Sequence, residues 1–207
     1  MHSNLLKKTC GDISFVNLRE LRIKNFKSLQ TYQHTLLDPI VFSGIGVHSG
    51  ENVTIVVNPA PEDHGILFVR TDIEDVYNPV KANWKNVLNT NMCTTIGANP
   101  KEPIATIEHL MASLYGLGIS NALITINGKE VPIMDGCSKT FSSTINQAGI
   151  VKQTKKREVL KIERSLKVGS GDSWVEISPG KDCVFEIEFL PTSRFGNSFS
   201  KQNIQFK

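Results

Sequence analysis

Residues 106–126 constrain the fold more than any other stretch, because they place a one-sided helix directly before an apolar strand. Thr106 stands where a helix cap is expected, and Gly116 and Gly118 supply a stop. The helix is indicated by apolar residues that recur on one face: Ile107, Leu110, Met111, Leu114 and Leu117. The next residues, ALITI at 122–126, are rich in β-branched side chains and predict a strand.

Further periodic segments surround this helix and strand. Other strands are predicted at residues 51–57, 66–70, 92–96 and 129–134. The last of these is expected because Asn127-Gly128 is a strong hairpin dipeptide that would return the chain beside residues 122–126. Residues 138–148 predict a second helix with one apolar side, and the polar residues 71–90 predict a loop or a small inserted ribbon.

The basic segment from Lys152 to Arg157 is predicted to be a linker that marks a domain boundary. Strands are then predicted at residues 159–168, 174–177, 183–190 and 203–206. In the third of them, Phe185, Ile187 and Phe189 alternate with glutamates, so one face is apolar. No helical segment follows that would cover this face, and we therefore expect this second unit to be cut short.

Composition is that of an ordinary globular protein and narrows the range of partners. The net charge is +3 over 207 residues, and residues 1–34 hold six lysines and arginines against two acids. We expect 1–34 to be a variable or disordered basic extension in which His2 and His34 are solvated, and we expect no nucleic-acid partner. Scattered cysteines and the lack of a long apolar run predict a cytoplasmic protein without a transmembrane segment. An organelle transit peptide is the less favoured interpretation of the basic front.

Few residues are candidates for chemistry, because the chain contains only five histidines. Glu108 and His109 stand side by side at the head of the predicted helix, where exposed N–H groups favour an ionised glutamate and a neutral imidazole can bind zinc. A catalytic zinc needs three protein ligands, so these residues alone favour a structural histidine over a metal ligand. His48 follows glycines that indicate tight turns, and His64 lies in a polar turn. The sequence lacks the motifs of dinucleotide sites, P-loops and serine nucleophiles.

Four motifs occur in an order that resembles one family. They are VFSGIGVHSG at 41–50, NMCTT at 91–95, TIEHLMASLYGLGISNA at 106–122 and EVPIMDG at 130–136. Together they are similar to the UDP-3-O-acyl-N-acetylglucosamine deacetylases, zinc enzymes of lipid A synthesis, from about residue 35 to residue 207. The resemblance implies an α+β fold, with a two-layer first domain of a sheet and two helices at 35–155. It also implies the truncated start of a similar second domain at 156–207.

The same resemblance implies the site. His109 would be a zinc ligand, and Glu108 would be the general base that activates the metal-bound water, with a UDP-linked acylated amino sugar as substrate. Residues near the substrate would be His48, Met92, Cys93 and Thr94. In the family the other zinc ligands come from a second-domain motif, and this chain has no histidine after His109. The isolated chain is therefore expected to be inactive, with the remaining zinc ligands absent.

Two other hypotheses stay open at this point. One is a non-catalytic binding or scaffolding module, including an RNA-binding one, because similar sheet-plus-helix domains occur in RNA-binding proteins. The lack of a basic stripe with interleaved aromatic residues outside 1–34 argues against RNA. The other is an enzyme whose complementing second half is supplied in trans, or whose reading frame is interrupted after Lys207.

Overall fold

The computed structural model describes residues 31–73, 78–170, 173–180, 184–189 and 202–206. Predictions for residues 1–30, for Cys183 and for residues 190–201 lie outside the described part of the chain. The chain divides into two compact units between Arg157 and Glu158, and each unit is described by itself. No helix in the described part is long and apolar enough to cross a membrane.

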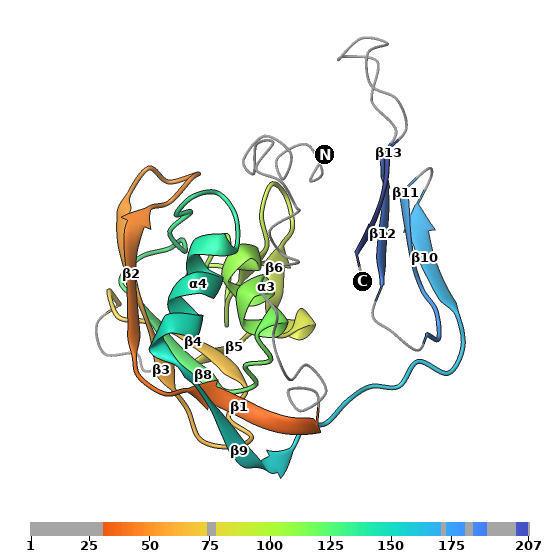
Figure 1. Ribbon diagram of the computed structural model, residues 1–207. Coiled ribbons are helices and arrows are strands. Elements are labelled where there is room, and N and C mark those ends of the chain that lie inside the picture. The colour runs from red at the N-terminus through yellow and green to blue at the C-terminus, as the bar shows by residue number, and fades with distance from the viewer. Residues whose placement is uncertain (1–30, 74–77, 171–172, 181–183, 190–201, 207) are drawn as a thin grey trace. The chain divides into compact units, whose positions relative to one another are not determined.

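The first unit is built on a mixed sheet of five strands. In order across the sheet they are β2 (Ile40–Ile45), β3 (Asn52–Pro59), β8 (Ala122–Ile126), β4 (Ile66–Arg70) and β5 (Val80–Lys81). Only β4 and β8 run parallel, and the other neighbours are antiparallel. Two helices, α3 (Glu108–Gly116) and α4 (Lys139–Ala148), pack on one face of this sheet (Figure 1). The predicted two-layer arrangement of a sheet and two helices is confirmed for this unit.

The core forms between the apolar face of the sheet, where every second strand residue is buried, and the apolar faces of the two helices. On β3, Val53, Ile55 and Val57 are buried, and their neighbours on the strand are more exposed. The helices contribute Leu110, Leu114, Phe141 and Ile145, all of them buried. Phe141 of α4 meets Phe42 of β2 edge to face, with ring centroids 4.9 Å apart. The predicted apolar faces are therefore the ones that pack.

Helix α3 ends as predicted but begins differently. Gly118 follows the helix with φ +75°, a left-handed conformation that favours glycine, while the Leu117 N–H donates to the Ser113 carbonyl. At the other end, Ile107 precedes the first helical residue and makes no side-chain cap. The predicted cap by Thr106 is wrong: Thr106 precedes the capping residue and has a left-handed φ of +59°, and its hydroxyl donates to Glu130 Oε1 at 2.8 Å.

The predicted hairpin strand at 129–134 is also wrong. β8 already has β3 on one side and β4 on the other, so no edge is free for a returning strand. The side chain of Asn127 accepts a hydrogen bond from the Thr54 N–H at 2.7 Å. The chain then runs along the segment before α3, where Ala105 N–H donates to the Lys129 carbonyl and Val131 N–H to the Ala105 carbonyl.

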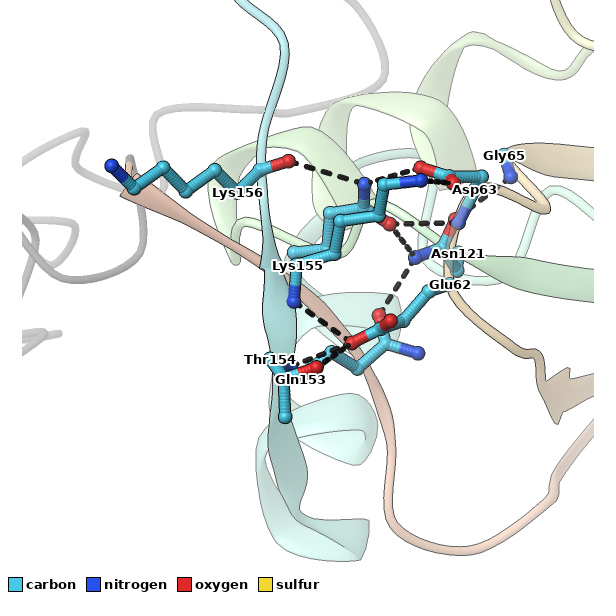
Figure 2. A network of polar contacts seen from close by, with 9 residues as sticks. Glu62, Asp63, Gly65, Asn121, Gln153, Thr154, Lys155 and Lys156 are labelled. Carbon is cyan, nitrogen blue, oxygen red and sulfur yellow. Dashed lines mark hydrogen bonds and ion pairs between the residues drawn. The ribbon is translucent and has the colours of Figure 1, made fainter.

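A two-stranded ribbon is formed by β1 (Tyr32–Leu36) and β9 (Ile150–Lys156), which are antiparallel. The predicted linker at 152–157 is thus wrong, because most of it is strand. His34 is also not solvated: it is 4% exposed within β1. Polar contacts fix the ribbon to the rest of the unit, and Figure 2 shows the Thr154 and Lys155 backbone N–H groups donating to the Glu62 carboxylate.

Along the chain between β5 and α3 lies a smaller ribbon of β6 (Val87–Asn89) and β7 (Thr95–Ile96), preceded by a 3-10 turn at Trp84–Asn86. Its first strand, β6, falls within the polar region 71–90 for which a loop or an inserted ribbon is predicted. The predicted strand at 92–96 survives only in β7. Met92 instead has φ +67°, which is incompatible with a strand.

In its described residues, the second unit contains two antiparallel pairs of strands. They are β10 (Leu166–Ser170) with β11 (Ser173–Ile177), and β12 (Phe185–Phe189) with β13 (Gln202–Phe206). The strand predicted at 159–168 begins only at Leu166. In the first pair, Val168 lies opposite Val175, and every residue of both strands is exposed.

Candidate active site

Glu108 occupies the first position of α3 and is half-buried. Its Oε2 accepts a hydrogen bond from the Thr94 N–H at 3.0 Å, which joins the segment before β7 to the head of the helix. One carboxylate oxygen is thus held by the backbone, and Oε1 has no hydrogen-bond partner among the described residues.

His109 follows in the same first turn and is also half-buried. Its carbonyl accepts from the Ser113 hydroxyl at 3.0 Å, and that hydroxyl also lies 2.9 Å from the Ser138 carbonyl at the start of α4. This contact fixes the turn that carries His109 against the second helix. In the described part of the chain, no three histidine, cysteine, aspartate or glutamate side chains are grouped so that they could hold a metal ion. The described residues by themselves therefore do not fit a catalytic zinc, which needs three protein ligands.

The three residues at 92–94 play different structural parts. Met92 projects its side chain to solvent, with 54% exposed, from a left-handed backbone conformation. Cys93 is buried, and its Sγ lies 3.6 Å from the Thr95 hydroxyl. Thr94 is half-buried and provides the backbone N–H to Glu108. Only Met92 and Thr94 therefore present groups at the surface near the head of α3.

His48 lies in a tight loop after β2, and its side chain is exposed. The loop is closed by a hydrogen bond from the Gly50 N–H to the Gly46 carbonyl at 2.9 Å. Gly46 is required by close contact: a Cβ there would lie 2.4 Å from a carboxylate oxygen of Glu130. The predicted interpretation of these glycines as tight turns is confirmed by the closed loop.

Glu130 is a site residue that the sequence did not single out. It is 3% exposed, and its carboxylate accepts from the backbone N–H groups of His48 and Ser49 and from the Thr106 hydroxyl. Burial alone would raise the pKa of Glu130, but hydrogen bonds from Ser49, Thr106 and His48 outweigh it and hold the pKa below its ordinary value. The one available signal was its place at the start of the EVPIMDG motif.

The structure thus brings together some of the predicted residues. Glu108 meets Thr94 directly, and the His48 loop is joined to the segment before α3 through Glu130. Backbone strain lies in the same segments, because Met92 and Thr106 both have left-handed φ angles that side chains rarely adopt.

Comparison with known proteins relates the chain to one family. The family model described as "LpxC: UDP-3-O-acyl N-acetylglycosamine deacetylase" matches residues 33–207. The UDP-3-O-acyl-N-acetylglucosamine deacetylase of Shewanella violacea is 41% identical over 159 residues, which cover 76% of this chain and 51% of the relative. The enzyme of the same name from Brucella ovis is 40% identical over 160 residues, covering 77% and 55%. The chain therefore spans about half the length of the curated relatives that it matches.

Proposed function

Because the chain belongs to the UDP-3-O-acyl-N-acetylglucosamine deacetylase family, we propose that it supplies the N-terminal portion of such an enzyme. The reaction would be hydrolysis of the N-acetyl group of UDP-3-O-acyl-N-acetylglucosamine, the committed step of lipid A synthesis. The observation within the structure that carries the proposal is the Glu108 carboxylate, held by the Thr94 N–H at the head of α3.

In this proposal Glu108 is the general base. With Oε2 held by the Thr94 N–H, Oε1 is free to take a proton from the attacking water. Water adds to the acyl carbonyl, the C–N bond breaks, and the proton passes to the departing amine, which gives acetate and the free amino sugar. Fixing one oxygen of the carboxylate keeps the other aimed in a single direction, which is what proton transfer requires.

Zinc is the cofactor that the family implies, and His109 is the described residue that would hold it. Zinc would supply Lewis-acid polarisation of the carbonyl. Since the described residues do not complete the ligand set, we expect a polypeptide of these 207 residues to retain far less than one zinc per chain and to show no turnover. The remaining ligands would have to come from a second half, within one chain or in trans.

The residues near the substrate are proposed to act in two ways. The exposed side chains of His48 and Met92 would contact the substrate. The buried side chain of Cys93 would hold the backbone of the neighbouring Thr94 in place. In domain terms, residues 35–155 would form the first deacetylase domain. Residues 156–207 would contribute strands to the second, and the first domain would also take in residues 32–34 of β1, which pair with β9.

The test is a chimera of this chain from residue 31 to its last matched residue, followed by the part of the Shewanella violacea relative beyond the match. Acetate release from UDP-3-O-acyl-N-acetylglucosamine and zinc content are measured. We expect turnover in the chimera, a loss of about 10²- to 10⁴-fold in Glu108→Gln with zinc retained, and loss of zinc in His109→Ala. Glu158→Gln, which removes an exposed carboxylate, is the matched control. Unchanged turnover in Glu108→Gln would refute the assignment of the base.

A further inference from the structure

Three segments that are distant in the sequence meet at one buried carboxylate. Glu130 receives the His48 N–H at 3.1 Å, the Ser49 N–H at 2.8 Å and the Thr106 hydroxyl at 2.8 Å. The first two partners belong to the loop after β2, and the third belongs to the segment before α3. A single side chain therefore holds the predicted substrate loop and the segment that leads to Glu108.

On the loop side, the contact depends on a glycine. Gly46 lies so close to the carboxylate that any added Cβ would overlap it, at 2.4 Å from Oε2. The loop is further closed by the Gly46 N–H, which donates to the Glu51 carbonyl at 3.0 Å. The backbone from 46 to 49 thus surrounds the Glu130 carboxylate, and the side chain of His48 is exposed to solvent.

On the helix side, the contact holds a strained residue. Thr106 has φ +59°, a conformation that costs a β-branched residue about 1 kcal/mol or more and persists only where its surroundings hold it. Two residues later the chain reaches Glu108. The main chain on each side of Glu130 also pairs with Ala105, so the carboxylate and the segment before α3 are held in one register.

The carboxylate form is needed for both contacts at once. Each partner of Glu130 is a donor, and the described residues place no cation against it. An ionised carboxylate has two acceptor oxygens and can satisfy the loop and the threonine together. An alkyl side chain of similar size would leave the N–H groups of His48 and Ser49 and the hydroxyl of buried Thr106 without this acceptor.

We propose that Glu130 is a positioning residue of the deacetylase site, whose one carboxylate fixes the His48 loop relative to the Glu108 turn of α3. The inference rests on the proposed function, in which His48 contacts the substrate and Glu108 takes the proton, so that the two residues must keep a fixed relative position. Glu130 is buried away from solvent and acts through the loop and through Thr106. A purely local support of the loop would leave the Glu108 turn undisturbed when Glu130 is changed.

Amide hydrogen exchange of the 207-residue chain separates these two roles without measuring turnover. Its outcome is therefore distinct from success or failure of the proposed function. In Glu130→Ala, we expect exchange of the His48 and Ser49 amides to rise by about tenfold or more. We expect the Thr94 amide, which donates to Glu108, to accelerate as well. The Gly65 amide, bound to Asn121 Oδ1, serves as the internal reference and should keep its exchange rate.

A second variant tests the link itself and keeps the fold even if Glu130→Ala does not. Thr106→Val is nearly isosteric and removes only the hydroxyl bond to Glu130. It should accelerate the Thr94 amide several-fold while the His48 and Ser49 amides stay protected. Thr71→Val, which removes a hydroxyl bond to the Ile126 carbonyl, is the matched control. If Thr94 exchange is unchanged in Thr106→Val, Glu130 does not position α3 and the proposal is overturned.

Discussion

Replacing Asn121 by alanine should destabilise the first unit more than any surface change. Asn121 is 1% exposed and lies between β9 and the turn before β4 (Figure 2). Its Oδ1 accepts the Gly65 N–H at 2.8 Å, and its Nδ2 donates to Gln33 Oε1 at 2.8 Å and to Gln153 Oε1 at 2.7 Å. One amide therefore ties β1, β9 and the Gly65 turn together.

The size of the effect follows from what the substitution leaves unpaired. Gln33 Oε1 keeps a second donor, the Asp63 N–H at 2.8 Å. The Gly65 N–H and Gln153 Oε1 lose the partner that Asn121 provides. A buried group left without its partner costs about 1–3 kcal/mol, so we expect a loss of about 3 kcal/mol in the free energy of unfolding. That is a large part of the roughly 5–15 kcal/mol by which a domain is stable.

Urea unfolding followed by circular dichroism measures this loss through the midpoint at constant slope. Asn91→Ala, at an exposed asparagine, is the control and should change stability by less than about 0.5 kcal/mol. Faster exchange of the Gly65 amide in Asn121→Ala would show that the turn is released. A loss below about 1 kcal/mol would refute the reasoning, because it would mean that water or rearranged glutamines satisfy the freed groups.

Two further outcomes can be measured on the same chain. Burial, together with nearby Lys152 and Arg157, lowers the pKa of His34, so the unfolded state takes up a proton first as the pH falls through 6.5. Stability should therefore decrease on acidification from about pH 7.5 to about pH 5.5, and His34→Phe should remove this part of the slope in urea titrations at each pH. Gly46→Ala should lose about 1–3 kcal/mol through overlap with Glu130, whereas Gly116→Ala, in a helix with open space around it, should gain about 0.5–1 kcal/mol. Equal effects of the two glycine substitutions in urea unfolding would contradict the close contact at Gly46.

The parts of the fold that sequence could predict are those in which local pattern and burial coincide. The second helix and the strand at 122–126 have apolar positions at the right period, and both occur as predicted. The strand β9 has no such face, because its burial pattern is almost wholly exposed. It is held by its pairing with β1 and by distant polar contacts, such as those of Glu62 with Thr154 and Lys155, which span 92 and 93 residues of sequence. The basic composition of residues 152–157 predicts a linker because none of these distant contacts can be read from the segment itself.

The hairpin at Asn127-Gly128 failed for a different physical reason. A hairpin dipeptide favours a turn, but the returning strand also needs a free edge beside its partner. β8 has none, because the parallel strand β4 takes the position that the hairpin strand would occupy. The pairing of β4 with β8 is a property of the whole topology, and no window of sequence around residue 127 contains it.

The sequence motif predicts the candidate site residues, but it does not predict the buried carboxylate that holds their segments together. Glu108 and His109 can be found from consecutive letters, whereas Glu130 is defined by partners 24 and 82 residues away. Thr106 shows how the two kinds of information conflict. A threonine before a helix ordinarily caps it by accepting a backbone N–H, yet Thr106 has φ +59° in place of the extended conformation of a cap, and its hydroxyl donates to the Glu130 carboxylate. The helix loses its cap, and the segment before it gains an anchor to the same carboxylate that holds the His48 loop. The capping rule therefore fails at the residue whose hydroxyl binds Glu130, the carboxylate that we propose positions Glu108.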